Sequence, residues 1–237
     1  MEALLLEWFT RNGRDLPWRR TRDPYAILVS EVMLQQTQAA RVVPRYLEWL
    51  ELWPDVHALA AASTADVIRV WQGLGYNRRA VSLHRAAQMV AERGWPDDLT
   101  ELPGVGPYTA AAVANFAFGC EVLPIDVNIG RVLVRTGAEF SPTAAQALFD
   151  LGATVCLARR PRCEICPLAV ECPSRGQTYE PQRKQGPFEG SFRQRRAALL
   201  RLVTHEPQPA TADPEAVESL LADGLVVVEN DLVRLPA

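Results

Sequence analysis

Residues 102–109 read Leu-Pro-Gly-Val-Gly-Pro-Tyr-Thr and lie between two stretches whose apolar residues have helical spacing. The two glycines predict a turn that ends the first helix, and Pro107 predicts the first turn of the second, a position that proline favours. Such a turn exposes backbone N–H groups at a helix N-terminus, where they can bind a phosphate group. By itself the pattern is weak evidence, and an ordinary connection between helices is the default interpretation.

The rest of the 237-residue chain is predicted to be all-α until its C-terminal end. Apolar residues recur at helical spacing over 1–10, 26–34, 39–53, 64–72, 79–92, 107–118, 128–136 and 143–157. Segments with proline and glycine separate these stretches, and alternating strand patterns are nearly absent among them. The sequence therefore predicts a helical body.

The composition changes to Pro, Gln, Gly and Arg from Pro173 to Gly190, which predicts a flexible or extended connection. Beyond it the pattern predicts two helices, then two short strands, over 191–204, 214–223, 225–229 and 232–235. This order is typical of a small winged-helix-like unit, and a plain folded cap on the body fits it about as well. The expected domains are a body over 1–175, a linker over 176–190 and a small C-terminal α/β extension over 191–237.

Four of the five cysteines lie in one 17-residue window, Cys156-x6-Cys163-x2-Cys166-x5-Cys172. Disulfides are disfavoured inside cells, so four clustered thiols indicate a metal centre. Structural zinc usually has two separated Cys-x2-Cys pairs, whereas this window has one, so a [4Fe–4S] cluster fits better. The spacing leaves zinc, or an incidental group of cysteines, as alternatives. The fifth cysteine, Cys120, is expected to be a small buried apolar residue.

Two acidic residues stand in apolar surroundings. Glu31 interrupts an otherwise apolar helical stretch, and Asp126 is flanked by Ile125 and Val127. Burial raises the pKa of a carboxyl group toward that of a general acid, and a buried carboxylate is costly unless it is paired or functional. The plainer interpretation is that each caps a helix or accepts a hydrogen bond from the backbone, which for Asp126 is about equally well supported.

Charge is distributed unevenly along a chain whose formal net charge is −3. Residues 202–237 carry −6, the remainder +3, and residues 155–201 alone +6. A basic face is thus available for the phosphates of a nucleic acid, although a solvated arginine-rich surface is the alternative. The N-terminal apolar run is broken by Glu7 and no stretch is long enough to span a membrane, so a cytoplasmic, nucleoid-associated location is expected.

Several motifs occur together in a fixed order. They are Leu16-Pro-Trp-Arg19, the Ser30–Thr37 stretch Ser-Glu-Val-Met-Leu-Gln-Gln-Thr, Gly73-Leu-Gly-Tyr76, the Leu102–Thr109 turn, Asp126 with Asn128, and the four cysteines. Over roughly residues 1–175 the chain resembles MutY-type adenine DNA glycosylases of the helix-hairpin-helix superfamily. The resemblance implies a two-lobed helical fold that binds double-stranded DNA as a monomer and flips the target base into a pocket.

The resemblance also implies roles for individual residues. Glu31 would protonate adenine N7, Asp126 would stabilise the oxocarbenium-like sugar, and Asn128 would orient Asp126. Gln36 would occupy the place of the flipped base, and Trp18 and Arg19 would shape the pocket. Further DNA contacts are expected from Gln35, Thr37, Tyr76, Asn77, Gly104, Val105 and Gly106. The four cysteines would hold the [4Fe–4S] cluster.

Tyr108 stands where lyase-competent relatives place a lysine that forms a Schiff base with the sugar. The sole lysine of the chain, Lys184, lies in the expected linker, so the amine nucleophile of those relatives is missing. The chain is therefore predicted to be a monofunctional glycosylase of base excision repair, which releases a mispaired adenine and leaves the strand uncut.

Some features depart from the MutY pattern. The tail 191–237 is too short for the Nudix-like domain that recognises 8-oxoguanine, Asn77 replaces a tyrosine, and the segment between Arg135 and Leu151 is shorter by about a helix. Because of these differences, the second hypothesis is a glycosylase that acts on thymine or uracil mismatches or on another purine lesion. Gln35 and Gln36 favour the adenine enzymes over this alternative. The third hypothesis is a DNA-binding iron–sulfur protein without catalysis, which Glu31, Asp126 and Tyr108 together argue against.

Overall fold

The computed structural model describes residues 1–178 and 186–237, and the chain divides into two compact units. Unit 1 contains residues 1–24 and 106–184, and unit 2 contains residues 25–105 and 185–237. Lys184 and the centre of the expected linker lie outside the described residues. Both units are helical, which confirms the predicted fold class, and no described helix is both long and apolar enough to cross a membrane.

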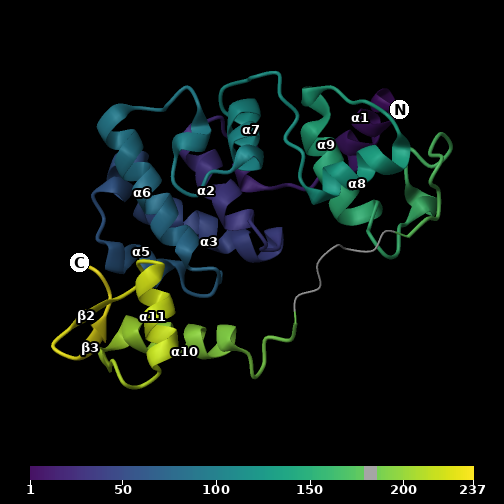
Figure 1. Ribbon diagram of the computed structural model, residues 1–237. Coiled ribbons are helices and arrows are strands. Elements are labelled where there is room, and N and C mark those ends of the chain that lie inside the picture. Colours follow the sequence, from purple (N-terminus) through teal and green to yellow (C-terminus); the bar gives the residue numbers. More distant parts are fainter. Residues whose placement is uncertain (179–185) are drawn as a thin grey trace. The chain divides into compact units, whose positions relative to one another are not determined.

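Unit 1 combines the N-terminal segment with the C-terminal half of the expected body, and its helices share one hydrophobic core (Figure 1). Its helices are α1 (Glu2–Asn12), α7 (Pro107–Phe116), α8 (Val127–Thr136) and α9 (Ala145–Asp150), with 3-10 turns at Pro17–Arg19, Pro142–Ala144 and Cys163–Ile165. The helix expected over 143–157 is interrupted, because α9 continues into a π-helical turn at Leu151–Val155. The core joins Leu5 of α1 to Ile129 of α8, Leu148 of α9 and Leu168 of the cysteine segment.

A buried ion pair fixes the N-terminal segment to α9. The Asp150 side chain is fully buried and accepts hydrogen bonds at 2.7 Å from the Arg14 backbone N–H and from the Arg14 and Arg19 guanidinium groups. Burial by itself would raise the pKa of Asp150, but the hydrogen bonds and charges of the two arginines outweigh burial and hold the pKa below its ordinary value. Sequence reasoning missed this pair.

Unit 2 begins with a helix that is almost completely buried. Its elements up to the glycine-rich turn are α2 (Pro24–Leu34), α3 (Ala39–Leu52), α4 (Val56–Ala60), α5 (Thr64–Trp71), α6 (Arg78–Arg93) and a 3-10 turn at Leu99–Glu101. Every residue from Tyr25 to Met33 is buried. Trp49 stacks edge-to-face on Trp53 and Trp71, with ring centroids 4.6 Å and 5.5 Å apart.

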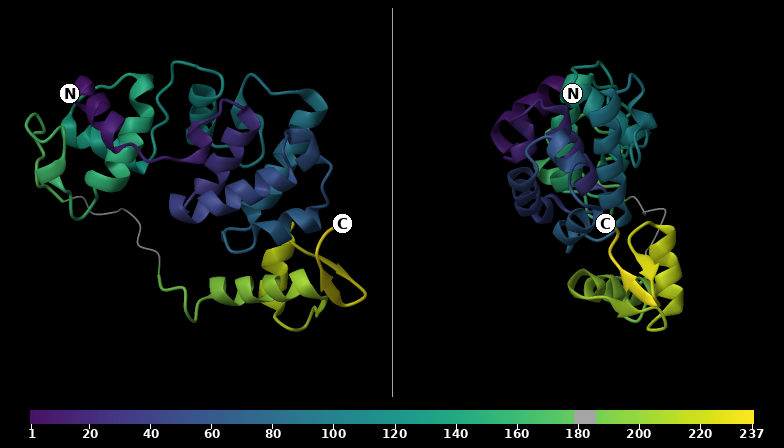
Figure 2. Two further views of the ribbon diagram at one scale, coloured as in Figure 1. Left: turned by 180° about the vertical axis from the view of Figure 1, so that it is seen from behind. Right: turned by 90° about the vertical axis from the view of Figure 1, so that its left-hand side faces the viewer.

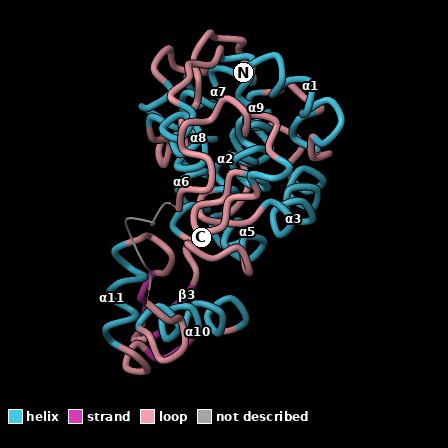
Figure 3. The backbone as a smooth tube through the Cα atoms, turned by 90° about the vertical axis from the view of Figure 1, so that its right-hand side faces the viewer, coloured by secondary structure: helices cyan, strands magenta, loops and turns pink. Residues whose placement is uncertain are grey.

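The C-terminal extension belongs to unit 2. It contains α10 (Phe192–His205), β1 (Gln208–Pro209), α11 (Pro214–Ala222), β2 (Val227–Glu229) and β3 (Leu232–Arg234) (Figure 2). The strands form an antiparallel sheet in the order β1-β3-β2, with Val228 opposite Val233, and in the described chain strands occur in this extension alone (Figure 3). The expected helices and hairpin are present, and β1 adds a strand to them.

The extension shares a hydrophobic core with the helical part of unit 2. Ile68 of α5 and Val81 of α6 pack with Leu200 of α10, Leu220 of α11 and Val233 of β3, all at most 3% exposed. This contact attaches the extension to the body through buried apolar surface, which a flexibly tethered module would lack.

Replacement of Asp150 by Asn is expected to destabilise the fold by about 3–5 kcal/mol, because it leaves two arginines without their buried counter-charge. Urea unfolding measures this loss. The stabilising charge is present above the unfolded pKa of aspartate, about 3.9, and is lost as the pH falls through the lower folded value. Asp15→Asn, which breaks an exposed pair with Arg20, is the control and should cost less than about 1 kcal/mol; equal losses in both variants would contradict the prediction.

Candidate active site and metal centre

Asp126 forms the N-cap of α8 and is held through both carboxylate oxygens. Oδ1 accepts hydrogen bonds from the backbone N–H groups of Asn128 at 2.9 Å and Ile129 at 2.7 Å, and Oδ2 accepts one from Asn128 Nδ2 at 2.7 Å. The expected apolar enclosure is wrong, since Asp126 is half-buried and its neighbours Ile125 and Val127 are 53% and 81% exposed. As the N-cap, Asp126 lies at the entrance of the helix, and here the residues on both sides of it are exposed.

A second layer of hydrogen bonds connects Asp126 to the cysteine segment. Arg131, 7% exposed, donates from Nη2 to Asn128 Oδ1 at 2.8 Å and to the Gly152 carbonyl at 2.7 Å, and from Nε to the Cys156 carbonyl at 2.8 Å. Burial lowers the pKa of Arg131, and the nearby Cys156 and Asp126 oppose that shift. The guanidinium therefore fixes Asn128, and Asn128 fixes the Asp126 carboxylate.

The π-helical turn at Leu151–Val155 brings its backbone close to Asn128. A Cβ atom on Gly152 would lie 2.8 Å from Asn128 Cβ, closer than real Cβ atoms approach, and at a tight 3.1 Å from the Asn128 carbonyl oxygen. Glycine is thus required for the close approach of Leu151–Val155 to α8. Neither Gly152 nor Arg131 was identified from the sequence, because an arginine in an amphipathic helix and a lone glycine carry no specific signal.

Glu31 lies in unit 2, in the middle of buried helix α2, and is 5% exposed. Its burial agrees with the sequence-based expectation. The end of the same helix leads into Gln35, Gln36 and Thr37, and Gln36 has a left-handed backbone with φ of 57°. Non-glycine residues rarely adopt this conformation, so the surrounding structure must hold Gln36 in place.

Arg79 holds the end of α2. Its Nη1 donates to the carbonyls of Val32, Met33 and Gln35 at 2.7, 3.0 and 2.6 Å, and its Nη2 donates to Thr37 Oγ1 at 3.2 Å and to the Gly75 carbonyl at 2.9 Å. The guanidinium carbon lies 5.2 Å from the Trp71 ring centroid and 5.6 Å from that of Tyr76. Burial lowers its pKa to about 10, so it stays charged at neutral pH. Sequence reasoning missed this residue.

The glycine-rich turn has the predicted local structure. Gly104 has φ of 80°, and a Cβ atom there would meet Ser82 Cβ at 2.7 Å, so glycine is required. Gln35 Nε2 donates to the Gly104 carbonyl at 3.4 Å, Val105 is buried, and Gly106 is the N-cap of α7 with Pro107 in the first turn. No side chain caps the start of α7, so the first backbone N–H groups of this helix have no partner from a capping residue.

Other predicted site residues lie in unit 1. Tyr108 packs edge-to-face on Phe149, with ring centroids 6.2 Å apart. Trp18 is 8% exposed, and the Arg19 guanidinium is engaged by Asp150 and lies over the Phe9 ring. Arg19 therefore acts through the packing of unit 1 rather than as a free charge.

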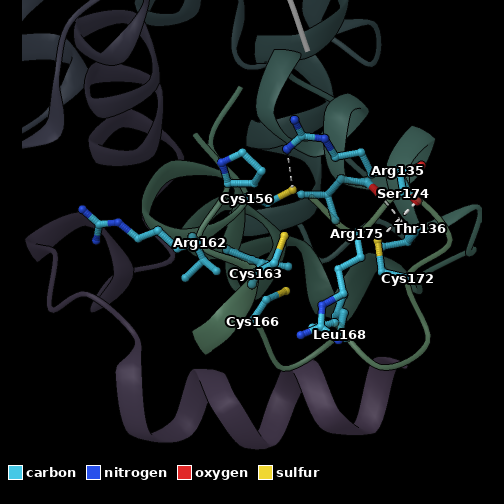
Figure 4. Close-up of a pocket in the computed structure, with 15 residues that line it drawn as sticks. Arg135, Thr136, Cys156, Arg162, Cys163, Cys166, Leu168, Cys172, Ser174 and Arg175 are labelled. Carbon is cyan, nitrogen blue, oxygen red and sulfur yellow. Dashed lines mark hydrogen bonds between the residues drawn. The ribbon is translucent and has the colours of Figure 1, made fainter. Parts of the chain in front are cut away.

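The four clustered cysteines line one pocket (Figure 4). Arg135 Nη1 donates to Cys156 Sγ at 3.3 Å, and the Gly176 backbone N–H donates to Cys163 Sγ at 3.3 Å. Burial raises the pKa of the Cys166 thiol, and its three neighbours raise it further. Thiolates in this position need a compensating cationic centre as well as the donors.

The donor set of this pocket, four cysteine thiols, is the one that a [4Fe–4S] cluster requires. No three Cys, His, Asp or Glu side chains in the described part of the chain converge closely enough to hold a single metal ion. The apolar walls of the pocket, which include Val132, Leu151 and Leu168, would shield an iron–sulfur centre from water. Cys120 lies apart from this pocket and is exposed, so the expectation that it is buried is wrong: it follows the end of α7 in a turn.

Two protein-family models match separate segments of the chain. Residues 29–151 match the model of the HhH-GPD superfamily base excision DNA repair protein, and residues 156–172 match the iron-sulfur binding domain of endonuclease III. The chain belongs to the HhH-GPD superfamily of base excision DNA repair proteins. The predictions of a DNA glycosylase, of DNA binding and of a [4Fe–4S] cluster are thereby confirmed.

Relatives cover much of the chain. An adenine DNA glycosylase of Mycobacterium tuberculosis is 42% identical over 270 residues, covering 94% of this chain and 88% of that protein. A human adenine DNA glycosylase is 39% identical over 217 residues, covering 75% of this chain and 40% of the human protein.

Solved structures show the same fold. A thermostable thymine-DNA glycosylase matches with a TM-score of 0.66 at 27% identity, covering 73% of this chain and 94% of that one. A trapped endonuclease III–DNA covalent intermediate matches with a TM-score of 0.63 at 22% identity, covering 73% and 92%, which supports the fold alone.

Substitution Cys163→Ser is expected to remove most of the bound iron, because the cluster loses one of four thiolate ligands. Iron analysis and visible absorbance of the purified protein measure the loss against about four iron atoms per chain in the wild type. Cys120→Ser is the matched control and should keep its full complement, since Cys120 lies outside the pocket. A Cys163→Ser protein with undiminished iron would contradict the assignment.

Proposed function

We propose that this chain is a monofunctional glycosylase that removes adenine mispaired with guanine or 8-oxoguanine from double-stranded DNA. The observation that carries the proposal is Asp126, whose two carboxylate oxygens are both fixed by hydrogen bonds at the N-terminus of α8. A carboxylate oriented in this way can stabilise a developing positive charge without reorganising. The relatives named adenine DNA glycosylase support adenine as the base.

In the proposed reaction, protonated Glu31 donates its proton to N7 of the flipped adenine. The bond between C1′ and N9 then breaks, its electrons leave with the neutral base, and positive charge develops on the sugar. Asp126 stabilises that charge, and a water molecule adds to C1′ and releases a proton. Burial of Glu31 within the apolar helix α2 favours the neutral acid that the first step needs.

The other predicted residues are assigned to binding. Gln36 fills the space of the flipped base, Gly104 and the start of α7 hold a backbone phosphate, and the cysteine segment presents a basic edge. Exposed arginines along that segment support the last assignment: Arg159, Arg160 and Arg162. Remaining contacts are assigned to Gln35, Thr37, Tyr76, Asn77, Val105, Gly106 and Trp18.

Monofunctional chemistry follows from the residue at position 108. Tyr108 offers a phenol where an amine would be needed for a Schiff base, and its ring is packed on Phe149. The abasic product strand should therefore stay intact until alkali is added. The protein is further proposed to act as a cytoplasmic, nucleoid-associated monomer.

A second candidate is a thymine mismatch glycosylase, which the likeness to the thermostable thymine-DNA glycosylase supports. A single-turnover assay on duplexes that carry A:8-oxoG, A:G, G:T and G:U pairs separates the candidates. Release of adenine alone supports the proposal, whereas release of thymine or uracil alone supports the second candidate.

Glu31→Gln and Asp126→Asn are each expected to slow adenine release by roughly 10²–10⁴-fold while leaving DNA affinity nearly unchanged, because each removes chemistry rather than binding. Single-turnover rates and gel-shift affinities on an A:8-oxoG duplex measure the two effects. Glu48→Gln, the same substitution at an exposed position on α3, is the control and should be fully active. An active Glu31→Gln enzyme would mean that the proton comes from another group.

Gly152→Ala tests the network behind Asp126. The added Cβ atom must displace Asn128, which misorients the carboxylate, so the rate of adenine release should fall roughly tenfold to a hundredfold with little change in affinity or iron content. Gly130→Ala on the same helix α8 is the control, because its Cβ atom would make an ordinary 3.6 Å contact with Ile125. Full activity of Gly152→Ala would show that this contact does not govern catalysis.

A further inference from the structure

Helix α8 carries charged residues on its inner side and apolar residues on its outer side, whereas a surface helix normally has the opposite pattern. Arg131 and Arg135 are 7% and 5% exposed, because their guanidinium groups donate to carbonyls of the cysteine segment. Val127 and Val134 are 81% and 73% exposed. These two valines stand about two helical turns apart, so they lie on one face of α8.

Ile125 continues this apolar surface around Asp126. Its side chain is 53% exposed, and its Cγ2 atom would lie 3.6 Å from a Cβ atom placed on Gly130. Ile125 therefore folds back along α8 toward Gly130, while Val127 occupies the first position of the helix. The residues directly before and after Asp126 thus both present exposed aliphatic side chains. We refer to Ile125 and Val127 as the apolar rim.

The position of the apolar rim beside Asp126 indicates what covers it. In the proposed reaction the Asp126 carboxylate stabilises charge at C1′, so it must contact the sugar of the target nucleotide. The neighbouring nucleotides are covalently joined to that sugar, which brings them to the residues next to Asp126. Aliphatic side chains cannot donate to a phosphate, but they can pack on the C–H surface of a sugar. Because the chain belongs to a superfamily of base excision DNA repair proteins, the occupant is a DNA strand.

Deoxyribose and ribose differ in such a contact by one hydroxyl group. The C2′ atom of deoxyribose carries only hydrogen, whereas that of ribose carries a hydroxyl group that needs a hydrogen-bond partner. The methyl groups of valine and isoleucine supply no partner, and they exclude the water that would supply one. Burying an unpaired hydroxyl group costs free energy, so a contact with aliphatic side chains favours deoxyribose.

We propose that the apolar rim packs on a sugar next to the target nucleotide and makes the chain select deoxyribose over ribose at that position. This inference rests on the proposed function, because it takes Asp126 to be the carboxylate that faces the target sugar. The rim contacts the sugar and reads no base. Ile125 and Val127 are therefore specificity-determining residues for the kind of nucleic acid.

The test measures binding to duplexes in which a tetrahydrofuran ring replaces the target nucleotide. One duplex is otherwise all deoxyribonucleotide, and two others carry a single ribonucleotide on the 5′ or the 3′ side of the ring. Wild-type protein should bind at least one ribonucleotide duplex roughly tenfold more weakly, within the 10²-fold limit to which an apolar surface rejects an added hydroxyl group. A duplex with the ribonucleotide several base pairs away should bind like the all-deoxyribonucleotide duplex.

Val127→Thr and Ile125→Thr test the two members of the rim. Each threonine supplies a hydroxyl group that can pair with the 2′-hydroxyl, so at least one variant should reduce the tenfold ratio to roughly twofold. Affinity for the all-deoxyribonucleotide duplex should change by less than about threefold, because the phosphate contacts remain. Val134→Thr is the matched control: it makes the same change on the same face of α8, away from Asp126, and should keep the ratio.

A wild-type protein that binds all of these duplexes equally would overturn the proposal. A ratio that neither Val127→Thr nor Ile125→Thr changes would overturn it as well, and so would an equal loss of the ratio in Val134→Thr. The duplexes carry no base at the target position and are not cleaved, so the result is independent of which base is excised. A wild-type enzyme that shows the ratio but releases no adenine would contradict the proposed function alone.

Discussion

The hydrogen-bonded connection from Asp126 through Asn128 and Arg131 to the cysteine segment is the interaction on which the rest of unit 1 depends. Arg131 is buried and donates to the carbonyls of Gly152 and Cys156 while it holds Asn128 Oδ1. Removing the guanidinium would leave buried acceptors without donors, which costs more than the bonds themselves contribute. The cluster segment and the Asp126 carboxylate, which we propose to be catalytic, are therefore parts of one polar network.

That connection gives the iron–sulfur segment a structural task that does not require electron transfer. A cluster that holds Cys156 in position also holds its carbonyl, which accepts from Arg131 Nε. The nearby Arg135 repeats the arrangement, since it donates to Cys156 Sγ and to the Leu157 carbonyl at 2.8 Å. Two successive turns of α8 thus bind the segment that carries the first thiol.

Unit 2 uses a different arginine for a comparable purpose. Arg79 donates hydrogen bonds to carbonyl groups at the end of α2 and in the Gly73–Tyr76 loop. The end of the helix that carries Glu31 and the loop that carries Tyr76 are therefore held by the same side chain. Arginine suits this task because one planar group offers five donors. The extension is attached to the same unit through apolar packing on α5 and α6, which brings Arg196 and Asp223 to a cavity that Gln36 also lines.

The sequence by itself determined the helical body, the glycine-rich turn, the cysteine centre and the buried acid Glu31, because periodicity, turn residues and clustered thiols are local signals. Asp150, an acid in an apolar stretch, carries a local signal of the same kind. Only the tertiary structure decided that Arg131 and Gly152 contact Asn128 and that Arg79 binds the end of α2. It also decided that Asp126 is a half-buried cap, that Cys120 is exposed, and that the extension packs on α5 and α6. These properties depend on which distant segments meet, since a side chain's partners are set by packing and not by its neighbours in the chain.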